Sequence, residues 1–169
     1  MSVGVGYDSH RFDETRPLVL GGVEIPGSPG LAAHSDGDAI AHAVTDAVIG
    51  ATAMGDIGTL FPDDDPANAG ADSVEMLTAV VRSIEAQGLG VQNVDVTVIT
   101  EKPHIGSHAS AMRERIAEAL GTSFSSVSIK AKSNEGMGWI GRGEGLAVIA
   151  VALVEPFDKK LGGNLADND

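Results

Sequence analysis

The sequence contains no cysteine, so it has neither a disulfide framework nor a thiolate that could act as nucleophile or metal ligand. No apolar run reaches the roughly 18 to 20 residues that a membrane-spanning helix needs. The N-terminus enters a strand-like pattern at once, which is not typical of a signal or transit segment. These absences predict a cytoplasmic protein.

Positive charge and aromatic side chains are also scarce. The chain has 11 Lys and Arg against 24 Asp and Glu, a formal net charge of −13. Such a surface argues against general binding to nucleic acid or to an anionic membrane. An anionic substrate would need local help from metal ions, helix N-termini or a few placed basic side chains. Because aromatic residues make up only 4%, the core must be built from small aliphatic side chains.

The length and hydrophobicity of the chain are those of one packed domain. It has 169 residues, of which 43% are hydrophobic. We expect a single domain over residues 1–155, followed by a polar, flexible tail over 156–169. No internal repeat or interdomain linker interrupts the pattern.

Hydrophobic alternation predicts the strands. It marks segments 2–7, 93–100 and 127–133, and Gly21-Gly22 marks a hairpin over 18–26, with a loop at 28–31. The run 146–154 is uniformly apolar, as in a strand that is covered on both faces.

Capping signals and a 3.6-residue period predict three helices. The first begins at about Asp36, capped by Ser35 or Asp36, and ends near Gly55. Asp72 begins the second, which stops at Gly88, and the third covers 108–120. Residues 57–72 between the first two form a long loop of a kind that often carries function.

The order of these elements predicts an α+β fold, a mixed sheet with helices packed on one face and a small hairpin insertion. The other face of the sheet is also apolar, so a neighbouring subunit is a candidate to cover it.

Asp8 and His10 end the first strand and, being two residues apart, point to the same side of an extended segment. His42 lies on the first helix, one turn after Asp38. An Asp and two His from separate elements form a recognised zinc set that leaves one tetrahedral position open. The residues alone leave a second interpretation open, a solvated Asp-x-His pair and a helix histidine bonded to a carbonyl.

Three further motifs have both a structural and a functional interpretation. HSDGD, 34–38, is either an ordinary helix cap or a phosphate site at a helix N-terminus, with His34 touching the same anion. FPDDDP, 61–66, is either a solvated loop or a site for hydroxyl groups or outer-shell metal contact. SNEGMGWIGRGEG, which contains Glu135 and Arg142, is either a turn or an anion-binding loop. GVG at 4–6 is not a dinucleotide motif, because Ser9 stands at the third glycine position and no helix follows.

Taken together, these motifs resemble the 2-C-methyl-D-erythritol 2,4-cyclodiphosphate synthases of the non-mevalonate isoprenoid pathway. The resemblance runs from residue 3 to about residue 154 and is carried by GVGYDSHRF, LGGVEIP, GLAAHSDGDAIAHAVTDAVIGATAMGDIGTLFPDDDP, NVDVTVI and GRGEG. It implies a phosphorus–oxygen lyase that acts on 4-diphosphocytidyl-2-C-methyl-D-erythritol 2-phosphate. In that reaction the 2-phosphate attacks the β-phosphate, CMP leaves, and a cyclic diphosphate forms.

The resemblance also implies cofactors and site residues. Asp8, His10 and His42 would bind one zinc ion per subunit, and Glu135 would hold a Mg²⁺ or Mn²⁺ that bridges the substrate diphosphate. His34 and Ser133 match positions that stabilise the transition state. Contacts to the methylerythritol part would come from Asp56, Ile57, Gly58, Phe61, Pro62, Asp63, Asp64 and Asp65. Contacts to cytidine and phosphates would come from Thr100, Lys102, Pro103, His104, Ile105, Gly106, Ala131 and Lys132, with further substrate contacts at Ser35, Trp139 and Arg142.

The assembly that the resemblance implies is a homotrimer, in which the sheets of three subunits pack around an axis and active sites lie between adjacent subunits. An isoprenoid diphosphate in the central cavity, near Arg142, is a further hypothesis. The chain departs from the common pattern at His104, Ser133 and Trp139, where Lys, Thr and Phe are usual. Two alternatives remain, a zinc-dependent phosphohydrolase and a non-catalytic trimer that binds isoprenoid diphosphate.

Overall fold

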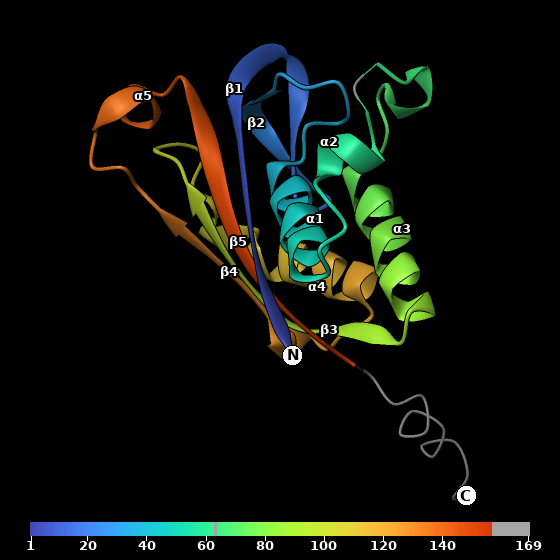
Figure 1. The fold of residues 1–169 in the computed structure, drawn as a ribbon. Helices are drawn as coiled ribbons and strands as arrows, with labels where there is room; N and C mark the ends of the chain where they lie inside the picture. Colours follow the sequence, from blue (N-terminus) through green and yellow to red (C-terminus); the bar gives the residue numbers. More distant parts are fainter. Residues whose placement is uncertain (63, 157–169) are drawn as a thin grey trace, which may run out of the picture.

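The computed structural model describes residues 1–62 and 64–156, so Asp63 and the predicted tail from residue 157 onward lie outside the described residues. Five strands form one mixed sheet in the order β2-β1-β5-β3-β4 (Figure 1). Their bounds are β1 (Ser2–Leu20), β2 (Val23–Leu31), β3 (Leu89–Ile99), β4 (Val127–Lys132) and β5 (Gly145–Pro156). Neighbours pair antiparallel except β3 and β4, which are parallel.

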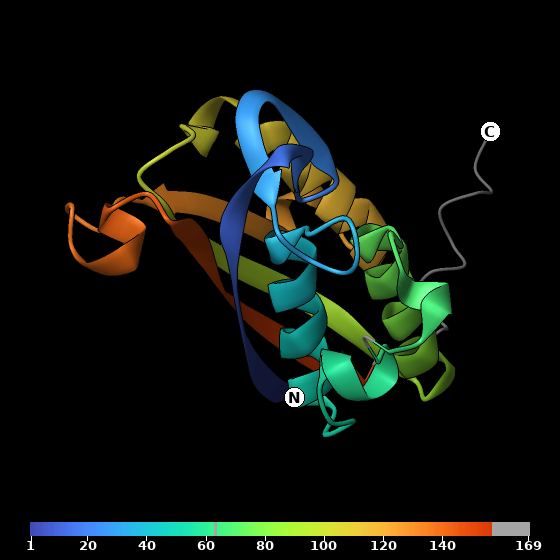
Figure 2. The same cartoon turned by 90° about the horizontal axis from the view of Figure 1, so that it is seen from above.

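The helices lie together on one side of this sheet. The long ones are α1 (Ala39–Ala51), α3 (Ser73–Ala86) and α4 (Ala109–Leu120). Figures 1 and 2 show all three on the same side, which confirms the predicted α+β fold with a helical layer on one face. Shorter helical segments are α2 (Ile57–Leu60), α5 (Gly138–Gly141), η1 (Pro66–Asn68), η2 (Ile105–Ser107) and η3 (Phe124–Ser126). Among the described residues, no helix is long and apolar enough to cross a membrane.

The core between sheet and helices is aliphatic, as the shortage of aromatic residues predicted. Its buried side chains, among the described residues, are Ala, Val, Leu, Ile and Met. The strand predicted over 93–100 is confirmed, with Val94, Val96 and Val98 fully buried on one face of β3.

The hairpin at Gly21-Gly22 is confirmed, but its strands are longer than predicted. Both glycines have positive φ, 57° and 69°, as tight hairpin turns require. The loop predicted at 28–31 was wrong, because these residues belong to β2 and pair with β1, Leu31 opposite Phe12 and Pro29 opposite Pro17. Register shifts before and after Pro17 and the position of β2 at the sheet edge accommodate the two prolines.

The first helix begins later than predicted. Its cap is Asp38 rather than Ser35 or Asp36, and its C-cap is Thr52 rather than Gly55. Asp38 is completely buried and accepts hydrogen bonds from Ile40 N and Ala41 N at 3.0 Å each. It also accepts from Gly21 N at 2.8 Å and Gly22 N at 2.6 Å. One carboxylate therefore caps α1 and fastens the hairpin turn to it.

The remaining helix predictions need smaller corrections. Asp72 caps α3 as predicted and accepts from Val74 N and Glu75 N. The segment 57–72, predicted as a loop, contains α2 and η1.

Strand β1 separates two different surfaces. On the helix side, α1 lies so close to Gly4 and Gly6 that a Cβ on either would stand 1.9 Å from a carbonyl oxygen of α1. On the opposite side, Val3 and Val5 are 63% exposed and Tyr7 is 56% exposed, beside the partly exposed Ile149 and Val151 of β5. Within one chain β5 is therefore covered on one face only, and the apolar open face expected from the sequence is present.

Candidate metal centre and active site

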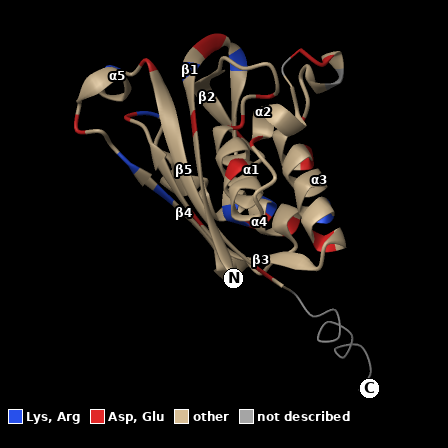
Figure 3. Cartoon of the chain, viewed as in Figure 1, with Lys and Arg blue, Asp and Glu red and all other residues tan. Residues whose placement is uncertain are grey.

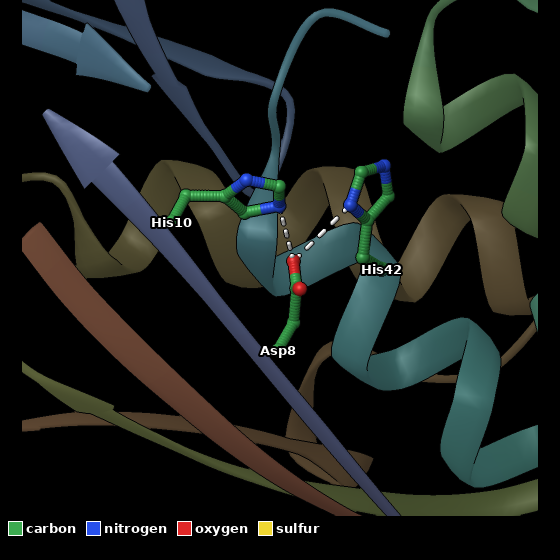
Figure 4. A group of neighbouring side chains, drawn as sticks. All are labelled: Asp8, His10 and His42. Atoms are coloured by element: carbon green, nitrogen blue, oxygen red, sulfur yellow. Dashed lines mark hydrogen bonds and ion pairs between the residues drawn. The ribbon is translucent and has the colours of Figure 1, made fainter. Parts of the chain in front are cut away.

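Asp8, His10 and His42 lie together where β1 faces α1, and Figure 4 shows their side chains pointing toward one another. Alternation along β1 puts Asp8 and His10 on the side that faces α1, and His42 projects from the first turn of that helix. Asp8 Oδ2 lies 2.9 Å from His10 Nε2 and 3.1 Å from His42 Nδ1. One candidate ligand atom from each residue lies within 4.8 Å of the others, so the three could share one metal ion.

The outer nitrogen of each imidazole is held by another part of the chain. His10 Nδ1 lies 2.8 Å from the carbonyl oxygen of Ala32, so Nδ1 carries the proton and Nε2 presents its lone pair. His42 Nε2 lies 2.8 Å from Ser73 Oγ and 3.1 Å from Ser35 Oγ, which leaves Nδ1 for the metal position. Among the described residues, His10 Nε2 is the buried side-chain polar atom without a well-formed hydrogen bond.

The electrostatics of the cluster fit a cation. Burial opposes ionisation of Asp8, but the hydrogen bonds and charges of His10 and His42 outweigh it and hold the pKa of this carboxyl well below its usual range. The contact with Asp8 raises the pKa of His10, against the opposing effects of burial and of the Arg16 charge. A carboxylate and two oriented imidazoles are a common zinc donor set, and three protein ligands leave a fourth position open. Asp8, His10 and His42 therefore fit a divalent metal ion such as the predicted zinc.

A cavity of about 310 Å³ opens beside this cluster. The predicted residues that line it are Asp8, His10, His34, Ser35, His42, Ile57, Gly58 and Phe61. Sequence reasoning missed Asn68 and Met76, which also line it. Asn68 Nδ2 donates to the carbonyl oxygen of Pro62 at 2.9 Å and so closes the loop that carries Phe61. The candidate metal ligands and part of the predicted methylerythritol pocket thus line the same cavity.

The phosphate site predicted at the N-terminus of the first helix is not supported. Asp38 occupies the N–H groups of Ile40 and Ala41. Asp38 N donates to Asp36 Oδ1 at 3.1 Å, and Gly37 N donates to Ser35 Oγ at 3.2 Å. The alternative interpretation, an ordinary cap, is correct, although the capping residue is Asp38.

Three of the acidic residues predicted for the methylerythritol pocket do not line the cavity. Asp56 caps α2, and its carboxylate accepts from Thr59 N and Thr59 Oγ1 at 2.8 Å each. These bonds hold the pKa of Asp56 below its usual value. Asp64 and Asp65 are exposed outside the cavity lining.

The residues predicted for cytidine and phosphates lie at the end of β4 and in the segment that follows β3. Because β3 and β4 are parallel, their carboxyl ends meet, and Thr100 N donates to the carbonyl oxygen of Lys132 at 2.9 Å. A second cavity of about 530 Å³ is lined by Lys102, Pro103, His104 and Arg142 together with residues of the hairpin, Phe12, Gly27, Ser28 and Pro29. In Figure 3 the basic stretches on β4 stand out from a chain with few positive charges.

Within one chain this second group does not join the triad. His10 pairs with Leu146 and Ile99 with Ala147, so both groups lie at the same end of the sheet with β5 between them. Glu135, Ser133, Ile105, Gly106 and Ala131 do not line the metal-side cavity. Ser133 Oγ donates to Glu135 Oε1 at 2.9 Å. Trp139 lines another hollow together with Arg11 and His10, so it is the predicted residue of this group that comes near the triad within one chain.

Arg16 is a supporting residue that sequence reasoning missed. Its guanidinium donates to the carbonyl oxygens of Ala33 and Ser35 and so fixes the loop that carries His34. No motif could have shown this, because the partners are backbone carbonyls that any residue supplies.

Solved structures share this fold. A 2C-methyl-D-erythritol-2,4-cyclodiphosphate synthase described as the CDP-bound form matches with a TM-score of 0.83 and 36% identity over 90% of this chain and 99% of that one. The bifunctional IspDF from Campylobacter jejuni matches with a TM-score of 0.89 and 40% identity, over 93% of this chain but only 42% of that longer one. Fold and site together define a chain of the cyclodiphosphate synthase type.

Proteins with similar sequences and a family model identify the family of this chain. The 2-C-methyl-D-erythritol 2,4-cyclodiphosphate synthase of Gemmatimonas aurantiaca is 58% identical over 154 residues, 91% of this chain and 93% of that protein. The synthase of Escherichia coli O6:K15:H31 is 51% identical over 91% of this chain and 97% of that protein. Residues 1–155 match the YgbB family model, and the chain belongs to the YgbB family.

Proposed function

We propose that this protein is a 2-C-methyl-D-erythritol 2,4-cyclodiphosphate synthase of the non-mevalonate isoprenoid pathway. It would convert 4-diphosphocytidyl-2-C-methyl-D-erythritol 2-phosphate to the cyclic diphosphate and release CMP. The observation that carries the proposal is the open three-ligand cluster of Asp8, His10 and His42 at the wall of a cavity that also contains Ile57, Gly58 and Phe61. Relatives of that name that are 58% and 51% identical support it.

The chemistry needs two phosphate groups to approach despite their repulsion. In a chain of net charge −13 this requires local cations. Asp8 Oδ2, His10 Nε2 and His42 Nδ1 would hold a zinc ion, which supplies a Lewis acid for a phosphate oxygen. Attack within one molecule needs orientation and charge neutralisation rather than a protein nucleophile. His34, an exposed residue of the cavity lining, would contact a phosphate there.

The second half of the proposed site comes from a neighbouring subunit. Ser133, Glu135 and residues 100–106 lie apart from the triad of their own chain, and the open apolar face of β1 and β5 offers a contact surface for assembly. We propose a homotrimer in which these residues complete the adjacent metal centre, with Glu135 holding Mg²⁺ or Mn²⁺ and Lys132 near the nucleotide. Solved relatives described as CDP complexes support a nucleotide pocket.

The proposal also includes a cytoplasmic location, a single domain over residues 1–155, and transition-state roles for His34 and Ser133. Binding of an isoprenoid diphosphate near Arg142 stays a prediction. Arg142 Nε donates to Glu144 Oε1 at 2.6 Å, so an anion at that place would compete with this ion pair.

The test uses one preparation of the full-length protein and of two variants, His42→Ala and His108→Ala. His108 is a matched control because it is the N-cap residue before α4 and its side chain makes no capping hydrogen bond. Zinc per subunit is measured by mass spectrometry, and CMP, cyclic diphosphate and inorganic phosphate are quantified after incubation with the authentic substrate. We expect His42→Ala to lose both zinc and cyclic product, while His108→Ala keeps both.

Each alternative has its own outcome. Release of inorganic phosphate in place of CMP would favour a zinc-dependent phosphohydrolase. Binding of isoprenoid diphosphate without any product would favour a non-catalytic trimer. Cyclic product formed by zinc-free protein would overturn the metal-dependent mechanism.

A further inference from the structure

We propose that Ser73 and Asp36 are positioning residues that hold His42 in the tautomer and orientation needed to bind the metal. The inference rests on the proposed metal centre and adds two residues to it that have no place in the ligand set. Ser73 is the first residue of α3 and Asp36 lies in the loop before α1, so neither neighbours His42 in the sequence.

The three side chains form a relay. Ser73 is completely buried, and its Oγ lies 2.8 Å from His42 Nε2. The Ser73 hydroxyl donates to Asp36 Oδ1. Ser73 N donates to the other carboxylate oxygen, Asp36 Oδ2, at 3.2 Å. The Asp36 carboxylate therefore accepts hydrogen bonds from both the hydroxyl and the backbone N–H of Ser73.

The direction of the protons follows from what each group can do. An ionised carboxylate only accepts hydrogen bonds, so the single hydroxyl proton of Ser73 is committed to Asp36. Ser73 Oγ can then only accept from His42, which puts the imidazole proton on Nε2. The lone pair of His42 is consequently on Nδ1, the atom that faces Asp8 at 3.1 Å.

The two metal-binding histidines are thus held in opposite tautomers by different partners. His10 gives its Nδ1 proton to the carbonyl oxygen of Ala32, and His42 gives its Nε2 proton to a hydroxyl backed by a carboxylate. A carboxylate behind a ligating histidine fixes the ring and raises its basicity, and loss of such a partner typically costs about 10- to 100-fold in metal affinity.

Two backbone bonds hold the relay in place. Asp36 N donates to the carbonyl oxygen of Ala71 at 3.1 Å, and Gly70 N donates to the carbonyl oxygen of His34 at 2.8 Å. They join the loop before α1 to the start of α3. Asp36, in that loop, and Ser73, at the start of α3, therefore keep a fixed separation, and Ser73 lies between Asp36 and His42.

The first experiment compares zinc affinity in Ser73→Ala and Thr45→Val, measured by competition with a chromophoric chelator. Thr45 is a matched control because its hydroxyl is also fully buried, lies on the same helix as His42, and donates to a backbone carbonyl, Ala41 O at 2.7 Å. We expect zinc affinity to fall about tenfold or more in Ser73→Ala and to stay unchanged in Thr45→Val. Asp36→Asn, which keeps the shape but loses the charge, should lower affinity in the same direction by a smaller factor.

The second experiment observes the imidazole N–H protons of His10 and His42 by proton NMR in the cobalt-substituted protein. The metal shifts the exchangeable N–H protons of its histidine ligands far from the other signals, so His10 and His42 should give one such signal each. In Ser73→Ala the His42 signal should exchange faster with water and broaden, while that of His10 stays as in the wild type. A purely structural role for Ser73 would not change one signal and spare the other.

The outcomes separate this inference from the proposed metal centre. Wild-type protein that binds no zinc at Asp8, His10 and His42 would refute the metal centre itself. Wild-type protein that binds zinc, with equal affinity and an unchanged His42 signal in Ser73→Ala, would refute the relay alone. A drop in thermal stability of Ser73→Ala without any change in zinc affinity would also refute it.

Discussion

The close approach of β1 to α1 makes a substitution at Gly6 a sensitive test of how the metal centre is built. A Cβ at this position would lie 1.9 Å from Ala43 O and 2.8 Å from Ala47 N. Since a carbon and a carbonyl oxygen in contact normally lie about 3.3 Å or more apart, Gly6→Ala would push strand and helix apart by about 1.4 Å. Asp8 and His10 lie on that strand and His42 on that helix, whereas a functional site tolerates displacements of only about 0.5 Å.

The expected cost has two parts. Overpacking against rigid backbone should destabilise the metal-free protein by about 3 kcal/mol or more, at the upper end of overpacking in cores. Zinc affinity should fall in addition, because the ligands no longer meet. Stability is measured by urea unfolding of chelator-treated protein, and affinity by chelator competition in the folded range.

Gly50→Ala is the matched control, because this glycine lies on α1 at the same contact. A Cβ added at Gly50 would lie 3.9 Å from Val5 O, which is an ordinary van der Waals contact, so an alanine fits there. The better helix propensity should then raise stability by roughly 0.5–1 kcal/mol and leave zinc affinity unchanged. If Gly6→Ala kept both the urea midpoint and the zinc affinity of the wild type, the claim that this contact sets the site would be wrong.

Two further predictions concern carboxylates. Asp38→Ala leaves four backbone N–H groups without their acceptor and should lower the free energy of unfolding in urea by at least about 3 kcal/mol. Asp72→Ala removes only the cap of α3 and should lower it by about 1 kcal/mol. Equal losses would contradict the claim that Asp38 also holds the hairpin turn. In metal-free protein, the lowered pKa of Asp8 contributes stability that is complete above about pH 3.9 and is lost as the pH falls through the pKa of the folded state. The raised pKa of His10 contributes stability that is complete below about pH 6.5 and is lost as the pH rises through the pKa of the folded state. The unfolding free energy of wild type relative to Asp8→Asn should therefore be largest between these limits, and a difference that does not vary with pH would refute the assignment.

The meeting of the three candidate metal ligands could be predicted because local rules place them. Alternation along a strand aligns Asp8 with His10, and a helix that starts near residue 38 turns His42 toward them. The resemblance to a known family then singled out the zinc interpretation from the residue pattern.

What could not be predicted depends on contacts between distant segments. Ser35, Asp36 and Asp38 are all suitable caps, and the choice of Asp38 is made by the N–H groups of Gly21 and Gly22 in the hairpin. The segment SPGL, 28–31, indicated a loop, but pairing with β1 makes it part of a strand. Ser73 was missed because its contact with His42 joins two helices across 31 residues.

The two glycines of β1 also determine how the strand can align. Ten consecutive residues, from Ser2 to Arg11, pair with β5 in one unbroken register. A slip by one residue would turn Val5 and Tyr7 toward α1, where even a methyl group does not fit, and would send Asp8 and His10 to the opposite face. Gly4 and Gly6 thus fix the register of β1, because only this register puts residues without a side chain against α1. The same register keeps Asp8 and His10 on the side of His42.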